Sequence, residues 1–361
     1  MTGLEALRER ILAIDEAMLK LWAERDEAAR KIGRLKREKG LPLQNFEAEK
    51  AVLDHAASIA GGVGLSVDRT RALVRILIES ALGAQERDRV QATGPDGRRA
   101  VIVGGAGLMG SWFARFLSEQ GYTVSVMDLR ESTFPAPREG ERFDLVVVAT
   151  PPSTVSSVLA AASALAKPSG LIVDIASVKG DASDTLQGLA SAGRKVASLH
   201  PMFGPMVDTL MGRNVLVLDC GRADAVAEAR GLFAATAAQT RELGLADHDR
   251  LMAEVLGLSH ATSLVFSEAL RSGSFGFREL EAVASTTFRK QADVSREVAN
   301  ENPRLYYEIQ TLNRENLGML RRFEAAATKL RQVVESKDRL GFSDMMHRAS
   351  AYYQGVPLRS K

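Results

Sequence analysis

Three glycines spaced as Gly105-x-Gly107-x-x-Gly110 follow directly on an apolar, β-branched stretch of the chain. This order predicts a strand, a tight turn and the start of a helix, the arrangement that binds a dinucleotide. Gly105 would permit the turn, Gly107 would let a pyrophosphate approach the backbone, and Gly110 would let the helix pack closely. The N–H groups of the helix start would then face the phosphates. The residues expected to line this cofactor site are the three glycines with Leu108 and Met109.

An acidic residue, Asp128, closes the next predicted strand at residues 123–127. A carboxylate at this place accepts a hydrogen bond from a free ribose 2′-hydroxyl and repels a 2′-phosphate. NAD is therefore the expected cofactor. Arg130 offers a cation nearby, so NADP is the less favoured alternative.

His200 and Thr150 each come at the end of a predicted strand. Ligand crevices of α/β sheets open at the carboxyl ends of the strands. A histidine titrates near neutral pH, so we expect His200 to be an acid–base group, with the Thr150 hydroxyl in the same crevice. The alternatives are a capping or core role for His200 and a simple strand end before Pro151 for Thr150.

Strand signals at 145–149, 171–175, 196–199 and 215–218 alternate with alanine-rich helical stretches. This rhythm is typical of a doubly wound, Rossmann-like α/β sheet. Further along the chain the strand signals stop, and helical patterns such as 251–270 and 305–334 predict an all-helical C-terminal domain.

Apolar residues recur every three or four positions near the N-terminus, which predicts one long helix over residues 4–39. Two shorter helices are expected at 47–59 and 66–85, and such a small three-helix unit should be stable as an intertwined oligomer. The segment 86–98 is polar and turn-rich. The expected organisation is an all-helical domain at 1–88, a linker at 89–98, an α/β domain at 99–245 and a helical domain at 246–361.

The 361 residues carry a net charge of +2, with 45% hydrophobic and 25% charged residues. This balance gives no drive toward nucleic acid, and neither a membrane-spanning run nor a signal peptide is expected. The single cysteine, Cys220, allows no intrachain disulfide, so a cytoplasmic location is expected. Cys220 has no Cys/His cluster around it in the sequence, which predicts a buried thiol and no metal site.

Three motifs closely resemble those of prephenate dehydrogenases, in particular those fused to an N-terminal chorismate mutase: 101–110, 173–179 and 199–205. The resemblance covers nearly the whole chain. It implies that His200 deprotonates the ring hydroxyl of prephenate while C4 gives a hydride to NAD, and loss of CO2 yields 4-hydroxyphenylpyruvate. Thr150 stands where the family often has a serine, and it is expected with Ser177 to contact the cofactor.

The same resemblance assigns the C-terminal helices to dimerisation and to substrate binding. The family places an arginine a few residues before an Asp-Pro, and here Arg296 precedes Asn302-Pro303. Arg296 is therefore expected to bind the prephenate carboxylate, with Arg289 as the alternative. His260 matches a family position near the substrate. The remaining histidines, His248, His347 and His55, are weaker candidates for a functional role, and His55 is expected at the surface.

The front of the chain resembles the all-helical chorismate mutases in the segments 7–15, 21–25 and 32–36. Arg25 and Lys36 are eleven residues apart, so at ~100° per residue they share a helix face and can converge on one small ligand. Arg8 lies about 25 Å further back along the same helix. We therefore expect Arg8 to serve the site of a partner chain, as in the intertwined dimer of this family.

The Claisen rearrangement of chorismate needs cations around two carboxylates and no nucleophile or metal. By resemblance Arg25 and Lys36 would bind the carboxylates, Glu49 the ring hydroxyl, and Gln85 with Lys36 the ether oxygen. Asn45 and Ala48 stand where many relatives have Asp and Arg, and Ala81 where some have serine. Mutase activity is therefore expected, and these departures would reduce it.

The leading hypothesis is a bifunctional enzyme of tyrosine biosynthesis that acts on chorismate and prephenate. One alternative is a dehydrogenase for 4-amino-4-deoxyprephenate in a natural-product pathway. Another is an NAD-binding regulator without catalysis, but such a protein needs neither His200 nor the pair Arg25 and Lys36.

Overall fold

A computed structural model describes residues 3–93, 97–207 and 209–355. The chain divides into two compact units, 1–245 and 246–361. Within the described ranges, no helix has the length and apolar character needed to cross a membrane.

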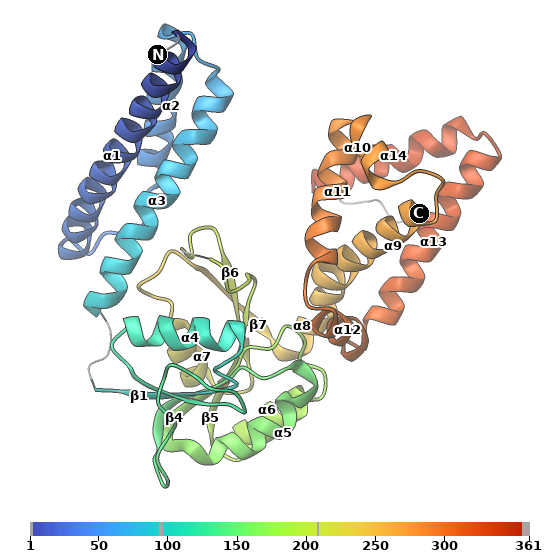
Figure 1. Cartoon of the computed structure of the whole chain (residues 1–361). Helices are drawn as coiled ribbons and strands as arrows, with labels where there is room; N and C mark the ends of the chain where they lie inside the picture. The colour runs from blue at the N-terminus through green and yellow to red at the C-terminus, as the bar shows by residue number, and fades with distance from the viewer. Residues whose placement is uncertain (1–2, 94–96, 208, 356–361) are drawn as a thin grey trace. The chain divides into compact units, whose positions relative to one another are not determined.

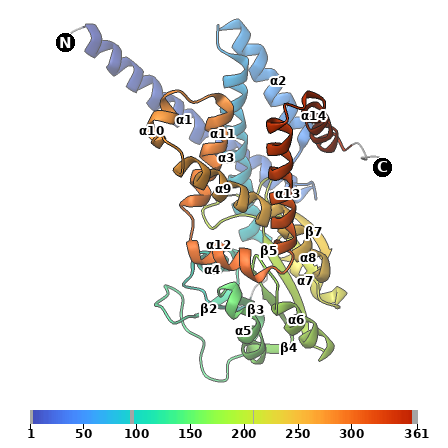
Figure 2. The ribbon, with the colours of Figure 1, turned by 90° about the vertical axis from the view of Figure 1, so that its right-hand side faces the viewer.

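The first unit begins with three helices, α1 (Gly3–Glu38), α2 (Phe46–Gly62) and α3 (Val67–Thr93), which run side by side in Figure 1. Figure 2 shows α1 as one unbroken helix, as its apolar periodicity predicts. The N-terminal half of this apolar stripe is largely exposed to solvent, since the exposed fraction is 63% for Leu7 and 57% for Ile11.

The third helix is longer than expected and joins the bundle to the sheet domain. Residues 89–93, expected as linker, are the last turns of α3. On the preceding turn the Glu86 side chain is buried and accepts hydrogen bonds from the Thr209 hydroxyl (2.5 Å) and from the backbone N–H groups of Leu210 (3.0 Å) and Ala237 (3.4 Å). We call these three hydrogen bonds the Glu86 clasp.

The sheet has seven strands in the order β2-β1-β3-β4-β5-β6-β7. The strands predicted from the sequence are present, and the predicted apolar segments within β3, β4, β5 and β6 are buried. The chain passes from β1 to β2 on one side and then crosses to β3 on the other side of β1. Ligand crevices form at such a change in strand order. The strands are β1 (Arg99–Val103), β2 (Thr123–Met127), β3 (Phe143–Val148), β4 (Ala166–Asp174), β5 (Lys195–Pro201), β6 (Asn214–Asp219) and β7 (Gln239–Gly244).

Two features of the sheet differ from the expected parallel arrangement. β5 and β6 are antiparallel, with His200 opposite Leu216, whereas every other strand pair is parallel. The edge strand β7 was not predicted, because its sequence Gln-Thr-Arg-Glu-Leu-Gly carries no apolar run.

Helices cover the sheet and bury its apolar faces (Figure 1). An aromatic cluster joins α4 to the segment after α7: Trp112 stacks on Phe116 at 4.8 Å between ring centroids, and Phe116 stacks on Phe233 at 5.4 Å. Burying each such side chain contributes about 1.5–3 kcal/mol. The helices are α4 (Leu108–Glu119), α5 (Val155–Ala162), α6 (Ala182–Ser191) and α7 (Ala223–Gly231), with short turns η1 (Pro152–Thr154) and η2 (Ser163–Leu165).

The second unit is helical throughout its described part, as predicted. The single helix expected at 305–334 is broken at Asn313, whose amide donates to the Asp249 carbonyl at 2.7 Å. A π-helical turn, η3, was not predicted. The helices that begin at Leu245 or later are α8 (Leu245–Met252), η3 (Ala253–Leu258), α9 (Ser259–Arg271), α10 (Phe277–Ala282), α11 (Thr286–Ala299), α12 (Pro303–Leu312), α13 (Asn316–Glu335) and α14 (Arg339–Tyr353).

Candidate active sites

The carboxyl ends of β3, β4 and β5 lie at one edge of the sheet. The three strands are parallel and in register, since Val148 pairs with Asp174 and Asp174 pairs with Ser198. Adjacent strands are ~4.8 Å apart, so the ends of β3 and β5 are separated by about 10 Å. This edge carries three residues singled out from the sequence, Thr150, Ser177 and His200.

The turn after β1 depends on a glycine that the sequence pattern did not single out. Gly104 has φ 87°, in the left-handed region, and a Cβ there would lie 2.7 Å from the Ala149 carbonyl oxygen. The residue of this turn with positive φ is thus Gly104. Gly105 is needed in the turn for space, because its Cβ would lie 2.7 Å from both methyl groups of Val126.

The other two glycines lie at the helix start. Gly107 is the N-cap residue of α4, in extended backbone conformation, and no side chain forms a capping hydrogen bond there. A Cβ at Gly110 would collide with the Gly104 carbonyl oxygen, so only glycine lets α4 pack on the turn. The exposed Leu108 and the half-buried Met109 complete the first turn of the helix. This cradle leaves backbone N–H groups open to a phosphate.

Asp128 follows β2 and anchors the glycine turn. Its carboxylate accepts hydrogen bonds from the backbone N–H groups of Ala106 and Arg130, both at 2.9 Å. Burial alone would raise the pKa of Asp128, but these hydrogen bonds and the Arg130 charge outweigh it and hold the pKa below its usual value. The carboxylate is therefore ionised at neutral pH and keeps lone pairs for a ribose hydroxyl.

Thr150 comes directly after β3, beside the glycine turn. Its methyl group lies 3.0 Å from the position of a Cβ on Gly104. Its hydroxyl oxygen is buried and has no hydrogen-bond partner among the residues that the structure describes. A buried hydroxyl without a partner is costly, so this one is suited to a bound ligand.

His200 is the penultimate residue of β5 and is 3% exposed. The strand that carries it is held by Lys179, whose fully buried ammonium donates to the Leu199 carbonyl (2.9 Å), to the Asp174 carboxylate (2.8 Å) and to the Ala176 carbonyl (2.7 Å). Lys179 therefore ties the loop after β4, which contains Ser177, to the residue before His200. Sequence reasoning assigned no role to this ion pair, although both its members lie in the 173–179 motif.

Cys220 is buried, as expected, and burial raises the pKa of its thiol to about 12. It therefore stays protonated and unreactive at neutral pH. Across the described ranges of the chain, no cluster of His, Cys, Asp and Glu could hold a metal ion.

The mutase-like residues Lys36, Glu49 and Gln85 lie close together in the helical bundle. The Lys36 ammonium donates to the Leu43 carbonyl at 2.7 Å, and burial lowers the pKa of Lys36 while the nearby charge of Glu49 opposes that shift. A Cβ on Gly33, one turn before Lys36, would lie 2.7 Å from the Gln85 side chain. Glycine at this position therefore lets α3 bring Gln85 next to α1.

The group of Lys36, Glu49 and Gln85 contains two buried oxygen atoms that accept no hydrogen bond from the described residues. One oxygen of Glu49 and the amide oxygen of Gln85 have no hydrogen-bond partner within the described residues. The second Glu49 oxygen accepts from the Gln44 amide at 3.4 Å. The group can thus accept a hydroxyl hydrogen from a small ligand.

Arg25 and Arg8 lie further down α1. The Arg25 guanidinium donates to the Leu77 carbonyl of α3 at 2.5 Å, on the side of α1 that faces α3. Arg8 is exposed. The unbroken helix separates the two arginines by about 25 Å, so both cannot bind one chorismate within a single chain.

The positions where this chain departs from many chorismate mutases have local structural roles. Asn45 is the N-cap residue of α2, and its side chain accepts from the Ala48 backbone N–H at 3.1 Å. Ala48 is exposed, and Ala81 is buried in the bundle.

In the second unit, His260 is the second residue after the π-helical turn. Its ring stacks on Tyr306 with 4.3 Å between centroids, and its Nδ1 atom is buried with no partner in the part of the chain that the structure describes. Burial lowers the pKa of His260, so the ring is neutral at pH 7. π-helical turns occur often at functional sites.

The two candidate arginines lie seven residues apart on α11, which places them on one helix face. Arg289 is exposed. Arg296 is half-exposed and pairs with Asp293 (3.1 Å) and Glu281 (3.8 Å).

The other histidines differ in their environments. His248 is fully buried and shares a 2.7 Å hydrogen bond with Asp249, whereas His347 and His55 are exposed.

Three family models match the chain in sequence order. Residues 7–86 match chorismate mutase type II. Residues 114–238 match the nucleotide-binding domain of prephenate dehydrogenase, and residues 245–348 match its dimerization domain.

Two curated relatives are similar over nearly the whole chain, and both are called T-protein. The protein of Enterobacter agglomerans is 26% identical over 350 residues, covering 97% of this chain and 93% of the relative. The protein of Haemophilus influenzae is 26% identical over 357 residues, covering 98% and 93%.

A solved structure of prephenate dehydrogenase from A. aeolicus, in complex with hydroxyphenyl propionate and NAD+, is similar with a TM-score of 0.59 at 17% identity. It covers 73% of this chain and 99% of that chain. At this identity the likeness concerns the fold.

Proposed function

Because the chain belongs to the prephenate dehydrogenase family and carries a type II chorismate mutase domain at its N-terminus, we propose that it is a bifunctional enzyme of tyrosine biosynthesis. It converts chorismate to prephenate and then oxidises prephenate to 4-hydroxyphenylpyruvate with NAD. The observation that carries the proposal is the match of all three domains in one chain. The mutase domain ends within α3, the NAD domain spans residues 99–245, and the substrate and dimerisation domain starts at 246.

The glycine turn and Asp128 fit NAD. The Oδ2 atom of Asp128 accepts one backbone N–H, from Ala106, and retains a lone pair that a ribose hydroxyl can use. The buried, unpartnered hydroxyl of Thr150 and the loop around Ser177 border the same edge of the sheet. When bound, NAD supplies the ring that takes up the hydride from prephenate C4.

His200 is proposed as the general base. It removes the proton from the ring hydroxyl of prephenate, so that the oxygen becomes a carbonyl as the C4–H bond breaks. The bond between the ring and its carboxylate then breaks and CO2 leaves. The electron pair of that bond passes through the ring to the carbonyl oxygen, which takes back a proton from His200 and becomes the phenol hydroxyl of the aromatic product. Lys179 positions His200 by holding the Leu199 carbonyl. Burial of His200 at 3% exposure keeps competing water away from the base.

Arg296 is proposed to bind the carboxylate of the prephenate side chain, with Arg289 on the same face of α11 as the alternative. The Arg296 pairs with Asp293 and Glu281 are half-exposed, so exchanging them for a substrate carboxylate costs little. His260, neutral and with a buried Nδ1, is proposed to hydrogen-bond the substrate.

For the mutase reaction, Lys36, Arg25 and Gln85 are proposed to hold the carboxylates and the ether oxygen of chorismate, and Glu49 its ring hydroxyl. The reaction needs no proton transfer, so these groups act by orienting the compact conformer and stabilising charge on the breaking ether. The absence of a cation at Ala48 predicts a weaker hold on the substrate.

The chain is proposed to act as a homodimer in the cytoplasm. Leu7, Ile11 and Met18 on α1 are each more than half exposed, and a second α1 would cover this stripe. In such a dimer, Arg8 reaches the mutase site of the partner chain. A single buried thiol agrees with a reducing compartment.

The direct test mixes the full-length protein with chorismate and NAD and follows NADH absorbance. NADH production from chorismate supports both activities. NADH from prephenate alone restricts the function to the dehydrogenase, and no NADH from either substrate contradicts the proposal. A parallel reaction with 4-amino-4-deoxyprephenate tests the amino substrate, and faster turnover of that compound would replace prephenate as the substrate.

The partner contribution of Arg8 is tested by subunit mixing. Arg8→Ala and Arg25→Ala should each lose nearly all mutase activity, because every site then lacks one cation. When the two variants are refolded together, a heterodimer contains one site with both arginines intact, so about a quarter of wild-type activity is expected from a statistical mixture. If mass spectrometry confirms heterodimers and activity stays absent, Arg8 does not serve a partner site.

A further inference from the structure

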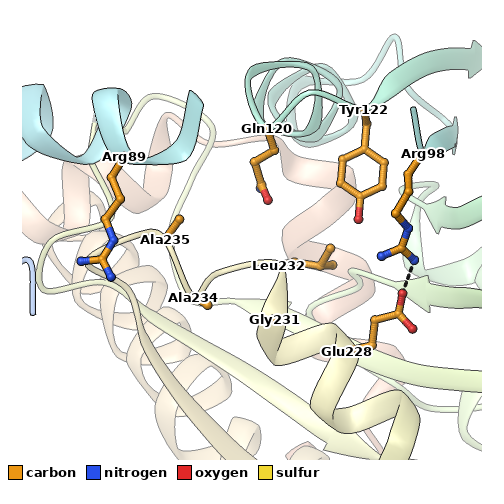
Figure 3. Close-up of a pocket in the computed structure, with 9 residues that line it drawn as sticks. All are labelled: Arg89, Arg98, Gln120, Tyr122, Glu228, Gly231, Leu232, Ala234 and Ala235. Carbon is orange, nitrogen blue, oxygen red and sulfur yellow. Dashed lines mark hydrogen bonds and ion pairs between the residues drawn. The ribbon is translucent and has the colours of Figure 1, made fainter. Parts of the chain in front are cut away.

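A cavity of about 410 Å³ lies in the first unit. Figure 3 shows it between the end of α3, the residue before β1, the end of α4 and the turn after α7. On one side it is lined by Arg98 and Tyr122, which precede β1 and β2, whereas the glycine turn follows β1. A strand of five residues spans about 17 Å, so this side of the cavity is separated from the cofactor cradle by the length of β1.

Gln120 supplies an unpaired donor to this cavity. It is the C-cap residue of α4, its side chain is 6% exposed, and its amide nitrogen finds no acceptor among the described residues. Figure 3 shows the side chain pointing into the cavity. A buried donor without an acceptor costs about 1–3 kcal/mol. A ligand oxygen would remove this cost.

The charged side chains make the cavity electropositive. Figure 3 shows Arg89 and Arg98 on its opposite sides. Glu228 is the one acid that lines it, and that carboxylate is already paired with Arg98 and with Lys195. Burial alone would raise the pKa of Glu228, but these two cations outweigh it and lower the pKa, so the acid stays ionised. The lining thus carries two cations, Arg89 and Arg98, and one carboxylate.

Tyr122 adds a further donor, because burial raises the pKa of its phenol and the hydroxyl keeps its proton. Leu232, which is 5% exposed, contributes an apolar surface to the cavity together with Ala234 and Ala235. The cavity therefore combines donors and positive charge with an apolar surface.

We propose that this cavity binds a small organic carboxylate with an apolar body. The carboxylate faces the Gln120 amide and the Arg89 guanidinium, and the body packs on Leu232 and Ala234. An inorganic anion would leave the apolar side in contact with water, which disfavours phosphate. The site is distinct from the proposed catalytic functions and does not depend on them.

Benzoate is a suitable probe, with benzamide as its uncharged isostere and acetate as the anion without a ring. Titration calorimetry with the full-length protein should detect benzoate binding on the order of 1 mM, the affinity usual for a ligand of this size. Benzamide and acetate should each bind at least tenfold more weakly. Equal affinity for benzamide contradicts the role of the charge, and equal affinity for acetate contradicts the apolar subsite.

Variants locate the binding. Gln120→Leu removes the unpaired donor, and Ala234→Trp fills the apolar side, so each should weaken benzoate binding at least tenfold. Arg115→Gln is the matched control, because Arg115 is an exposed arginine on α4 outside the cavity lining. NADH formation from saturating prephenate should equal that of the wild type in all three variants, which shows that each is folded.

Benzoate binding that persists in Ala234→Trp would show that the ligand sits elsewhere, for example in a catalytic site. No binding of benzoate to the wild type at 20-fold the expected dissociation constant would overturn the proposal. Should Ala234→Trp fail to fold, Gln120→Leu decides by itself: unchanged affinity there contradicts the site.

Discussion

Removing the Glu86 side chain should free the segment that follows His200 from the end of α3. Two backbone N–H groups, those of Leu210 and Ala237, donate to this buried carboxylate, as does the Thr209 hydroxyl. In Glu86→Ala the hydroxyl can turn toward another acceptor, but the two N–H groups cannot. The clasp is therefore expected to be lost as a unit.

The size of the effect follows from these two donors. A buried donor left without an acceptor costs about 1–3 kcal/mol, so Glu86→Ala should destabilise the closed clasp by about 2–6 kcal/mol. At tenfold per 1.4 kcal/mol, the lower bound corresponds to about 30-fold faster local opening.

Hydrogen exchange read by mass spectrometry measures that opening in the full-length protein. Peptides that contain residues 209–213 and 236–240 should lose protection at least 30-fold in Glu86→Ala, while peptides of β1 and β3 stay protected. Glu119→Ala is the control, because Glu119 is an exposed acid at the end of α4. Protection unchanged within threefold in Glu86→Ala would refute the clasp as the element that fixes this segment.

The pH dependence of the same measurement has a defined sign. Burial raises the pKa of Glu86 above its usual 4.5, and its hydrogen bonds only partly oppose the shift. A raised pKa in the folded protein gives a contribution to stability that is fully present below pH 4.5 and is lost as the pH rises through the folded pKa. The protection of wild type relative to Glu86→Ala should therefore fall as the pH is raised from 4.5, and a rise would contradict the assignment.

Three further changes test the proposed sites. Asp128→Ser should narrow the preference for NAD over NADP in steady-state kinetics, and a strong wild-type preference for NADP would show that Asp128 does not read the ribose. His200→Asn should lower the dehydrogenase kcat by about 10²-fold or more, while mutase activity is retained; equal loss of both activities would indicate misfolding. Arg296→Ala should raise the KM for prephenate by about 30-fold or more, through loss of a charge-assisted hydrogen bond, with little change in kcat. A normal KM in that variant, together with a raised KM in Arg289→Ala, would show that Arg289 binds the prephenate carboxylate.

The sheet was largely predictable because its inner strands are apolar, β-branched runs buried on both faces, such as 145–148. Its edge was not. β7 carries Arg241 and Glu242 and pairs through backbone hydrogen bonds along one side only, so its sequence has no apolar signal. The direction of β6 could not be predicted either, because a buried apolar strand has the same sequence pattern whether its neighbour is parallel or antiparallel.

The local chemistry of the sites was predictable to the level of residue type. The glycine spacing identified the cofactor cradle, but it could not tell which glycine has positive φ, since Gly104 and Gly105 are adjacent. The sequence predicted that the third helix ends at residue 85, because the polar segment that contains the turn-rich residues 94–97 begins at Glu86. In the structure α3 continues to Thr93, and Glu86 makes tertiary hydrogen bonds. Buried groups such as Lys179 and Gln120 gave no sequence signal, because polarity alone predicts exposure.

The antiparallel return of β6 keeps the residues between β5 and β6 at the edge where His200 lies, and so allows the clasp to form there. The partners of Glu86 come much later in the chain, Leu210 by 124 residues and Ala237 by 151. A ribosome that adds ~5–20 residues per second makes Ala237 about 8–30 s after Glu86. Until Thr209 and Leu210 have been made, the Glu86 carboxylate has no donor from the sheet domain. The mutase bundle is thus translated first, but the end of its third helix is joined to the dehydrogenase sheet only when that sheet has been made.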